Sequence, residues 1–310
     1  DKLAQHLRGV MAHMSEMAKH EERSAYLFLL PWIIGFLVFS AGPLAASFLI
    51  SFTEWPILAA PKWTGLKNYT TMLSDPLFWQ SLKVTVYYTA IGVPMGLIAG
   101  FFVVLLTNQK VRWIALWRSV YYMPAVVGGV VVARMWQGVF NPIYGILNAL
   151  LRLLGLQGPN WLGEPEWVIP AFLIMALWNV AGANMVIYLA GLQSIPTEIY
   201  EAAMIDGAGA WHKLRHVTIP MMTPVIFLRL IMGIIGSFQV FTQAFVMTNG
   251  GPSHASLFYV LYLYRNAFQY SKMGYASALA WVLFAIILLL TVLFFRSSER
   301  WVYYQGELRK

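Results

Sequence analysis

The chain has 310 residues, of which 59% are hydrophobic and only 11% are charged, and its mean hydropathy is +0.62. A water-soluble domain carries about 25% charged residues, so this composition excludes that class and indicates an integral membrane protein. The net charge of +8 does not indicate a nucleic-acid partner, because the basic residues form no patch on a polar domain. Cysteine is absent, which excludes disulfides and thiolate-bound metals.

Six segments are long and apolar enough to cross a bilayer, which requires about 20 mostly apolar residues. They cover approximately residues 26–52, 84–106, 119–140, 167–190, 223–247 and 276–295. The third segment contains Arg134 and the fifth contains Arg229. We therefore expect an all-α integral membrane protein with six transmembrane helices over 26–295, preceded by a tail over 1–25 and followed by one over 296–310.

The distribution of Lys and Arg predicts the orientation of these spans. With the N-terminus inside, 13 of the 21 Lys and Arg residues lie in the inner segments and six lie in the outer loops. This bias predicts that both tails are cytoplasmic and that the protein crosses the membrane several times. We expect no cleavable signal peptide, because the first apolar segment is long enough to span and follows about 25 polar residues.

Two of the outer loops carry helical patterns of their own. Residues 141–156 begin with Asn141 and Pro142 and continue in a leucine-rich run, and residues 257–268 are rich in tyrosine. Amphipathic helices of this kind often lie at the membrane interface. Capping of the helix bundle and docking of a partner protein are both open for these two helices.

The sequence carries no catalytic or metal-binding pattern. It lacks a phosphate-binding glycine loop and a serine in a G-x-S-x-G context. His212 and His216 are four residues apart, but Lys213 and Arg215 beside them would repel a cation. We expect neither enzymatic activity nor a metal or cofactor bound by this chain, so if the protein moves something uphill, the energy would come from elsewhere.

The inner loop over 196–222 has more structure than a simple connection requires. Thr197 and the acidic residues that follow it are typical of the start of a helix, where the helix dipole favours negative charge. The glycine at 207 would end or bend this helix, and a second short helix would follow and end at Pro220.

The carboxylates of this loop are Glu198, Glu201 and Asp206. An acidic helical surface suits a basic groove on another protein, because Arg can bind a carboxylate through two hydrogen bonds. The alternative is a capped helix that only joins two spans.

The stretch EAAMIDGAGAWHKLRHVTIP resembles the EAA loop of permease subunits in bacterial binding-protein-dependent ABC importers. The matching positions are Glu201, Ala202, Ala203, Gly207 and Pro220. The departures are Leu214, Val217 and Ile219, which replace a frequent Phe, an Ile and a Leu. The stretches over 26–55, 63–89, 248–252 and 262–280 resemble the carbohydrate-uptake group, the MalF type. The resemblance therefore covers nearly the whole chain beyond residue 24.

The resemblance implies the type I permease fold of ABC importers and a set of partners. These are a second homologous permease, two ATPase subunits that bind ATP and Mg, an extracytoplasmic solute-binding protein and a sugar substrate. It also implies that the loop over 196–222 contains a coupling helix seated in a cleft of one ATPase subunit. Glu201 would pair with an Arg of that subunit, and Asp206 and Gly207 would shape the turn.

Polar side chains within the fourth and fifth spans are candidates for the substrate pathway, because such residues usually face a cavity or a partner helix. The candidates are Asn179, Asn184, Ser237, Gln239, Thr242 and Gln243. Amides offer both donors and acceptors to sugar hydroxyls, and the resemblance implies that these two spans line the central site. Hydrogen bonding between helices is the alternative explanation.

Arg134 and Arg229 raise the question of a charged cargo. Snorkelling to the membrane surface or a structural pair would explain each residue. The alternative is an anionic cargo, such as a uronic-acid oligosaccharide or a glycerol phosphate, attracted by a positive pathway.

We therefore predict a permease subunit of an ATP-driven importer for oligosaccharides or related sugars. It would alternate between outward and inward access, driven by the ATPase subunits through the EAA loop. The alternative is an ion-coupled secondary sugar carrier. Carriers of that class use acidic residues within the membrane, and no Asp or Glu occurs in the six apolar segments.

Overall fold

The computed structural model describes residues 2–109 and 111–303. These residues are mostly helical, with one short hairpin in which β1 (Thr53–Glu54) pairs with β2 (Lys62–Trp63). Within them, four helices are long and apolar enough to cross a membrane, and the number rises to six if each of two bent pairs counts as one span. The prediction of six crossing segments is consistent with this range.

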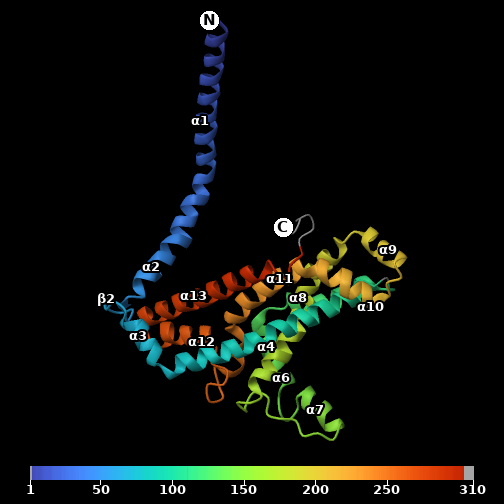
Figure 1. The fold of residues 1–310 in the computed structure, drawn as a ribbon. Helices are drawn as coiled ribbons and strands as arrows, with labels where there is room; N and C mark the ends of the chain where they lie inside the picture. The colour runs from blue at the N-terminus through green and yellow to red at the C-terminus, as the bar shows by residue number, and fades with distance from the viewer. Residues whose placement is uncertain (1, 110, 304–310) are drawn as a thin grey trace.

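The first span belongs to a long helical rod. Helix α1 (Lys2–Phe36) continues through a π-helical turn, η1 (Leu37–Ala41), into α2 (Gly42–Ile50). The rod extends away from the other helices, as Figure 1 shows. The segment predicted as a tail over 1–25 is therefore helical from Lys2 onward and continuous with the first span.

The second span is α4 (Pro76–Thr107), which follows α3 (Lys67–Ser74) and is longer than predicted at its outer end. Asp75 caps α4, because its carboxylate accepts a hydrogen bond of 2.9 Å from the backbone N–H of Leu77. Proline at the first helical position has no N–H to leave unsatisfied, so the Asp-Pro pair starts the helix here.

The third span, indicated by the apolar segment over 119–140, is broken into two helices. It consists of α5 (Ile114–Val126) and α6 (Gly129–Val139), whose axes differ by 100°. Val127 and Gly128 between them have extended backbone, with ψ of 130° and 140°. The fourth span, α8 (Val168–Gln193), bends by 46° between its two halves.

The fifth span begins earlier than predicted. Helix α9 (Thr197–Ile205) is followed by a continuous helical run of α10 (Ala210–Lys213), η2 (Leu214–Thr218) and α11 (Ile219–Phe238). The predicted helix end at Pro220 was wrong. Proline is tolerated in the first turn of a helix, and the π-helical turn η2 places Pro220 there. Because α11 ends at Phe238, the polar stretch over 239–243 lies beyond it, before η3 (Ala244–Thr248).

The remaining helices are α7 (Ile146–Leu153), α12 (Tyr259–Tyr264), η4 (Arg265–Gln269) and α13 (Met273–Ser298), the sixth span. Helix α7 lies on the surface of the fold within the predicted segment 141–156. Of the two possibilities left open for residues 257–268, capping of the bundle agrees with the structure, since Leu257, Phe258 and Tyr259 are fully buried. These residues carry no charge, and α12 packs against α4 and α13.

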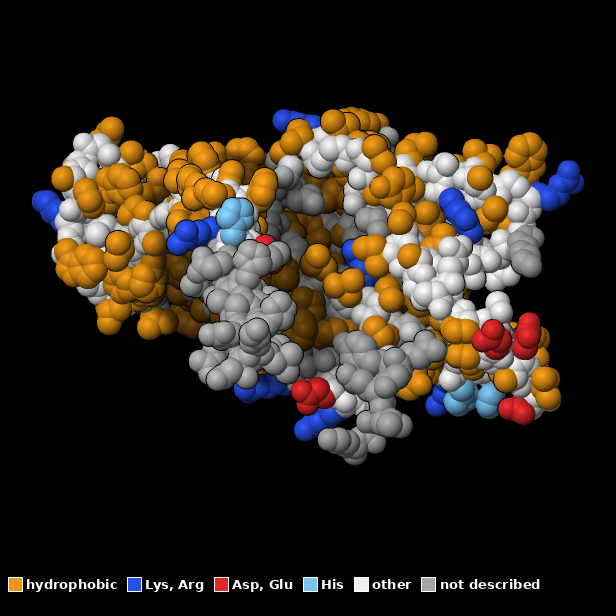
Figure 2. Space-filling model, turned by 90° about the horizontal axis from the view of Figure 1, so that it is seen from above, with side chains coloured by type: hydrophobic (Ala, Val, Ile, Leu, Met, Phe, Trp, Pro, Cys, Tyr) orange, Lys and Arg blue, Asp and Glu red, His pale blue; other side chains and the backbone are white. Residues whose placement is uncertain are grey.

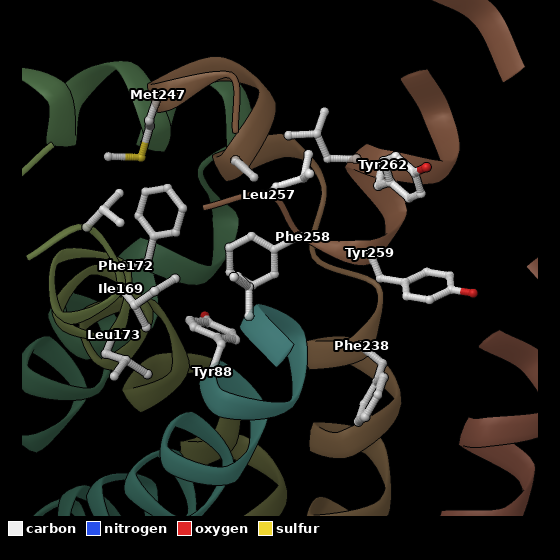
Figure 3. Packing of buried hydrophobic residues seen from close by; sticks show 14 of the residues in the cluster. Tyr88, Ile169, Phe172, Leu173, Phe238, Met247, Leu257, Phe258, Tyr259 and Tyr262 are labelled. Carbon is white, nitrogen blue, oxygen red and sulfur yellow. The ribbon is translucent and has the colours of Figure 1, made fainter. Parts of the chain in front are cut away.

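The main hydrophobic core lies where α4, α8, α11 and α12 meet (Figure 3). Phe258 is at its centre, with ring centroids 5.1 Å from Tyr88 and 5.9 Å from Phe172. Helix α8 also approaches α4 closely at a glycine. A Cβ on Gly100 would lie 2.7 Å from the Cβ of Asn184, so only glycine allows this packing.

Candidate functional site

The helix α9, which precedes the fifth span, has the start and the end that the sequence predicts. It begins at Thr197 and ends in a Schellman motif, in which Gly207 N–H donates to Met204 O at 3.0 Å and Ala208 N–H donates to Ala203 O at 2.8 Å. Gly207 has φ of +79°, a conformation that residues with a Cβ rarely adopt. The turn after α9 is therefore defined by its own backbone hydrogen bonds.

One face of α9 is attached to the fifth span. The hydroxyl of Tyr200 lies 3.0 Å from the hydroxyl of Thr218 in η2, and the Tyr200 ring packs beside a buried cluster that includes Met222 of α11. Since α10, η2 and α11 form one continuous helix, Tyr200 connects α9 directly to the fifth span.

The other face of α9 is exposed and combines charge with apolar surface. The carboxylates of Glu198, Glu201 and Asp206 are exposed, and Ile205 and Trp211 expose 87% and 71% of their surface. Figure 2 shows acidic and histidine side chains together with hydrophobic ones at this end of the molecule. Such a mixed surface on a rigid helix is suited to a protein partner.

A cavity of about 420 Å³ lies between α4, the α5–α6 pair, α8 and α11. Four of the predicted pathway residues contribute to its wall: Asn179, Asn184, Ser237 and Gln243. Gln239 and Thr242 do not line this cavity, and Gln239 instead lies exposed at the end of α11. The helix ends one residue before Gln239, which places that side chain outside the regular register of the fifth span.

The amides in this cavity also hold the helices together. Asn179 Nδ2 donates to Pro124 O of α5, and Asn184 Nδ2 donates to Gly96 O of α4, each at 3.2 Å. Asn184 is only 2% exposed, and its Oδ1 is buried without a hydrogen-bond partner among the described residues. The same amide side chains therefore both line the cavity and form hydrogen bonds between helices.

The two arginines of the spans have different surroundings. Arg229 lines the cavity, and its Nε is buried without an acceptor among the described residues. Arg134 is exposed outside the cavity, and its Nη1 donates to Gln137 Oε1 at 3.1 Å. The expectation that a structural partner explains Arg134 agrees with this hydrogen bond, whereas Arg229 has no such partner in the described part of the chain.

Sequence reasoning overlooked the contribution of α4 to the cavity. Tyr88, Gly92 and Gly96 lie on its wall. The signal was present in the spacing of Gly92, Gly96 and Gly100, because small residues every four positions mark a helix face that another helix approaches closely.

A hydrogen-bond cluster at the outer end was also missed. The carboxylate of Asp75 accepts hydrogen bonds from the hydroxyls of Tyr262 and Tyr275, the latter at 2.8 Å, and so joins α4 to α12 and α13. Burial opposes ionisation of Asp75, but these hydrogen bonds and those from backbone N–H groups outweigh it and lower the pKa of the carboxyl. The Asp-Pro cap was visible in the sequence, whereas the distant tyrosines were not.

Apolar helices long enough to cross a membrane, with a cavity between four of them, are typical of a membrane transport protein. The chain belongs to the family of binding-protein-dependent transport system inner membrane components, whose model matches residues 92–302. The predicted permease family is thereby confirmed, and the alternative of an ion-coupled secondary carrier is excluded. Membership of this family also agrees with a multi-pass protein of the inner membrane.

Curated relatives resemble the chain over most of its length. The probable ABC transporter permease protein YesP of Bacillus subtilis is 39% identical over 298 residues, covering 94% of this chain and 96% of that protein. The trehalose/maltose transport system permease protein MalF of Thermococcus litoralis is 31% identical, covering 91% and 96%. The lactose transport system permease protein LacF of Rhizobium radiobacter is 32% identical, covering 92% and 98%.

The fold is similar to that of a solved permease. A chain in the crystal structure of a bacterial ABC transporter involved in the import of the acidic polysaccharide alginate superposes with a TM-score of 0.81. The two chains are 24% identical, and the match covers 92% of this chain and 99% of the other. The predicted type I permease fold of ABC importers is therefore confirmed.

Proposed function

We propose that this permease subunit moves an oligosaccharide or a related sugar across the cytoplasmic membrane, alternating between outward and inward access. Relatives named for trehalose and maltose, lactose, and arabinooligosaccharides support a sugar as cargo. The cavity supports it too, because amide and hydroxyl groups on its wall can bind sugar hydroxyls. The chain itself performs no chemical reaction, and ATP and Mg bind to partner ATPase subunits.

Two ATPase subunits would drive this motion through the segment 196–222, with α9 as the coupling helix. The observation that carries this proposal is that the two faces of α9 have different surroundings. Glu201 and its acidic neighbours are exposed on one face, while Tyr200 on the other face is bonded to the helix that lines the cavity. A basic cleft on an ATPase subunit could bind Glu201 through an Arg, and movement of that cleft would displace the fifth span.

A second, homologous permease would complete the membrane part of the importer, and a solute-binding protein would deliver the sugar from outside. The first span supports the need for a second permease. Between residues 20 and 50 no side chain is buried, and Phe28 and Phe39 expose 87% and 82% of their surface. The rod touches the rest of the chain near its outer end, where Phe48 packs against Trp281 at 4.8 Å.

The domain limits follow from this assembly. Residues 26–295 would form the permease domain, and the segments over 1–25 and 296–310 would lie in the cytoplasm. The positive-inside distribution of Lys and Arg supports this orientation.

The charge reversal Glu201→Lys tests the coupling role. The two permeases should still assemble, while ATP hydrolysis stimulated by the loaded solute-binding protein should fall by about tenfold or more, because a buried charge pair at the ATPase interface is lost. Glu22→Lys is the control, since Glu22 is likewise exposed but lies on α1, away from α9 (Figure 1). Undiminished stimulated hydrolysis in Glu201→Lys would contradict the coupling role of α9.

A further inference from the structure

The cavity contains a positive charge without a counter-charge. Arg229 lies within the continuous helix from Ala210 to Phe238, nine residues before its end, which corresponds to about 14 Å along the axis. Its guanidinium donates no hydrogen bond to another described residue, and its Nε is buried. An unpaired cation at this depth is unfavourable, and such residues usually mark a substrate or ion pathway.

Among the described residues, no acidic side chain pairs with Arg229. No Asp or Glu occurs between residues 76 and 163, between 167 and 197, or between 207 and 298. These ranges include every helix that contributes to the cavity wall. The counter-charge must therefore come from outside this subunit, from the cargo or from another protein.

The rest of the cavity wall matches a ligand that combines a carboxylate with hydroxyl groups. Asn179 and Ser237 can bind hydroxyls of a sugar, as can Gln243 at the outer end. A Cβ on Gly236 would meet no atom within 4 Å, so α11 leaves open space on the side of the cavity beyond Arg229. Arg presents a planar set of donors that fits a carboxylate through two parallel hydrogen bonds.

We propose that the cargo is an acidic oligosaccharide of the uronic-acid class and that Arg229 binds its carboxylate inside the membrane. This inference rests on the proposed function, because it names the substrate class of that same cavity. Arg229 thereby selects for a negatively charged cargo during translocation. This selection is additional to any that the solute-binding protein makes when it delivers the cargo. A neutral sugar would leave the guanidinium unpaired, which disfavours its passage.

The test uses the complete importer, with both permeases, the ATPase subunits and the solute-binding protein, reconstituted in proteoliposomes. Uptake driven by ATP is measured for oligogalacturonates and for maltooligosaccharides of matched length. The variants are Arg229→Gln, which removes the charge, and Arg229→Lys, which retains it without the planar fork. Arg134→Gln is the control, because Arg134 is exposed and does not line the cavity.

The expected result is uptake of oligogalacturonates by the unmodified importer and a fall of about tenfold or more in Arg229→Gln, with a smaller fall in Arg229→Lys. Arg134→Gln should transport at the original rate. Uptake of maltooligosaccharides alone, unchanged in Arg229→Gln, would overturn the acidic cargo and leave sugar import intact. Absence of ATP-dependent uptake for both sugars would instead contradict sugar import itself.

A second readout separates the cargo from a partner protein as the source of the counter-charge. Co-purification of the second permease is measured for Arg229→Gln and Arg229→Lys. It should be unchanged if the carboxylate belongs to the cargo. Loss of the second permease in Arg229→Gln, with retention in Arg229→Lys, would assign the counter-charge to that subunit and overturn the proposal.

Discussion

Helix α12 and helix α9 are both short connections between spans, but they are held in opposite ways. The chain entering α12 is fully buried, and the Tyr259 backbone N–H and hydroxyl both donate hydrogen bonds of 2.9 Å, to Thr85 Oγ1 and Leu279 O. Helix α9 has no buried residue and is fixed by its Schellman motif and one hydroxyl pair.

This difference separates a structural connection, α12, from the proposed coupling surface on α9. Around α12, apolar burial and hydrogen bonds to two spans fix the outer ends of those spans relative to one another. Around α9, the carboxylates and the apolar side chains of Ile205 and Trp211 stay available for another protein. Substitutions near α12 should therefore reduce stability, whereas those in α9 should reduce coupling and leave the fold intact.

The largest expected effect is on stability, in Phe258→Ala. Phe258 is fully buried between Tyr88 and Phe172, so its truncation leaves a cavity and should cost about 3–5 kcal/mol. Thermal unfolding of the detergent-purified importer, followed by intrinsic fluorescence, measures the loss. Phe268→Ala is the matched control, because Phe268 belongs to the same segment but is 63% exposed. Equal destabilisation by both substitutions would contradict the assignment of the core.

A smaller loss is expected from Asp75→Asn, which removes the negative charge that accepts hydrogen bonds from Tyr262 and Tyr275. Hydrogen bonds to a charged group contribute about 1.5–3 kcal/mol, so unfolding should become easier by that amount at pH 7. Glu54→Gln is the control, since its ion pair with Lys67 has both side chains 64% exposed and should contribute less than about 1 kcal/mol.

The pH dependence sharpens this prediction. Burial raises the pKa of Asp75, but the hydrogen bonds lower it by more than burial raises it. The pKa is therefore lower in the folded protein than in the unfolded chain. The stabilisation is therefore complete above the unfolded value of about 3.9 and is lost as the pH falls through the folded value. The difference in unfolding between Asp75→Asn and the unmodified protein should persist at pH 7 and shrink below about pH 4. A constant difference down to pH 3 would contradict ionisation of Asp75 as its cause.

The same contrast explains how far the sequence could predict the structure. The start and end of α9 were predictable, because Thr197 and Gly207 act through local backbone geometry. The burial of Phe258 was not predictable, since an aromatic, uncharged run has the same pattern at a membrane interface and inside a fold. Which environment it takes depends on Thr85 and Leu279, which are distant in the sequence.

The candidate site was predictable to a similar extent. Polar residues in apolar spans pointed to Asn179, Asn184 and Ser237, all of which line the cavity. Gln239 was misplaced because the end of α11 at Phe238 carries no proline or glycine signal, so the helix was extended through it. To predict that Arg229 lies in the cavity wall, one would have to know that the fifth helix begins at Ala210. The sequence did not indicate this start, because the proline at 220 was interpreted as a helix end.

The smallest effect on stability is expected for Gly207→Ala at the end of α9, together with a clear effect on coupling. A Cβ on Gly207 meets no neighbouring atom, but φ is +79°, so alanine should cost about 1 kcal/mol and shift the end of the helix. Gly209→Ala is a matched control two residues away, because Gly209 also faces open space but has φ of −70°. Sugar uptake and stimulated ATP hydrolysis should both fall in Gly207→Ala and remain unchanged in Gly209→Ala. Equal losses in the two variants would show that bulk at the interface, and not the left-handed turn, controls coupling at this end of the fold.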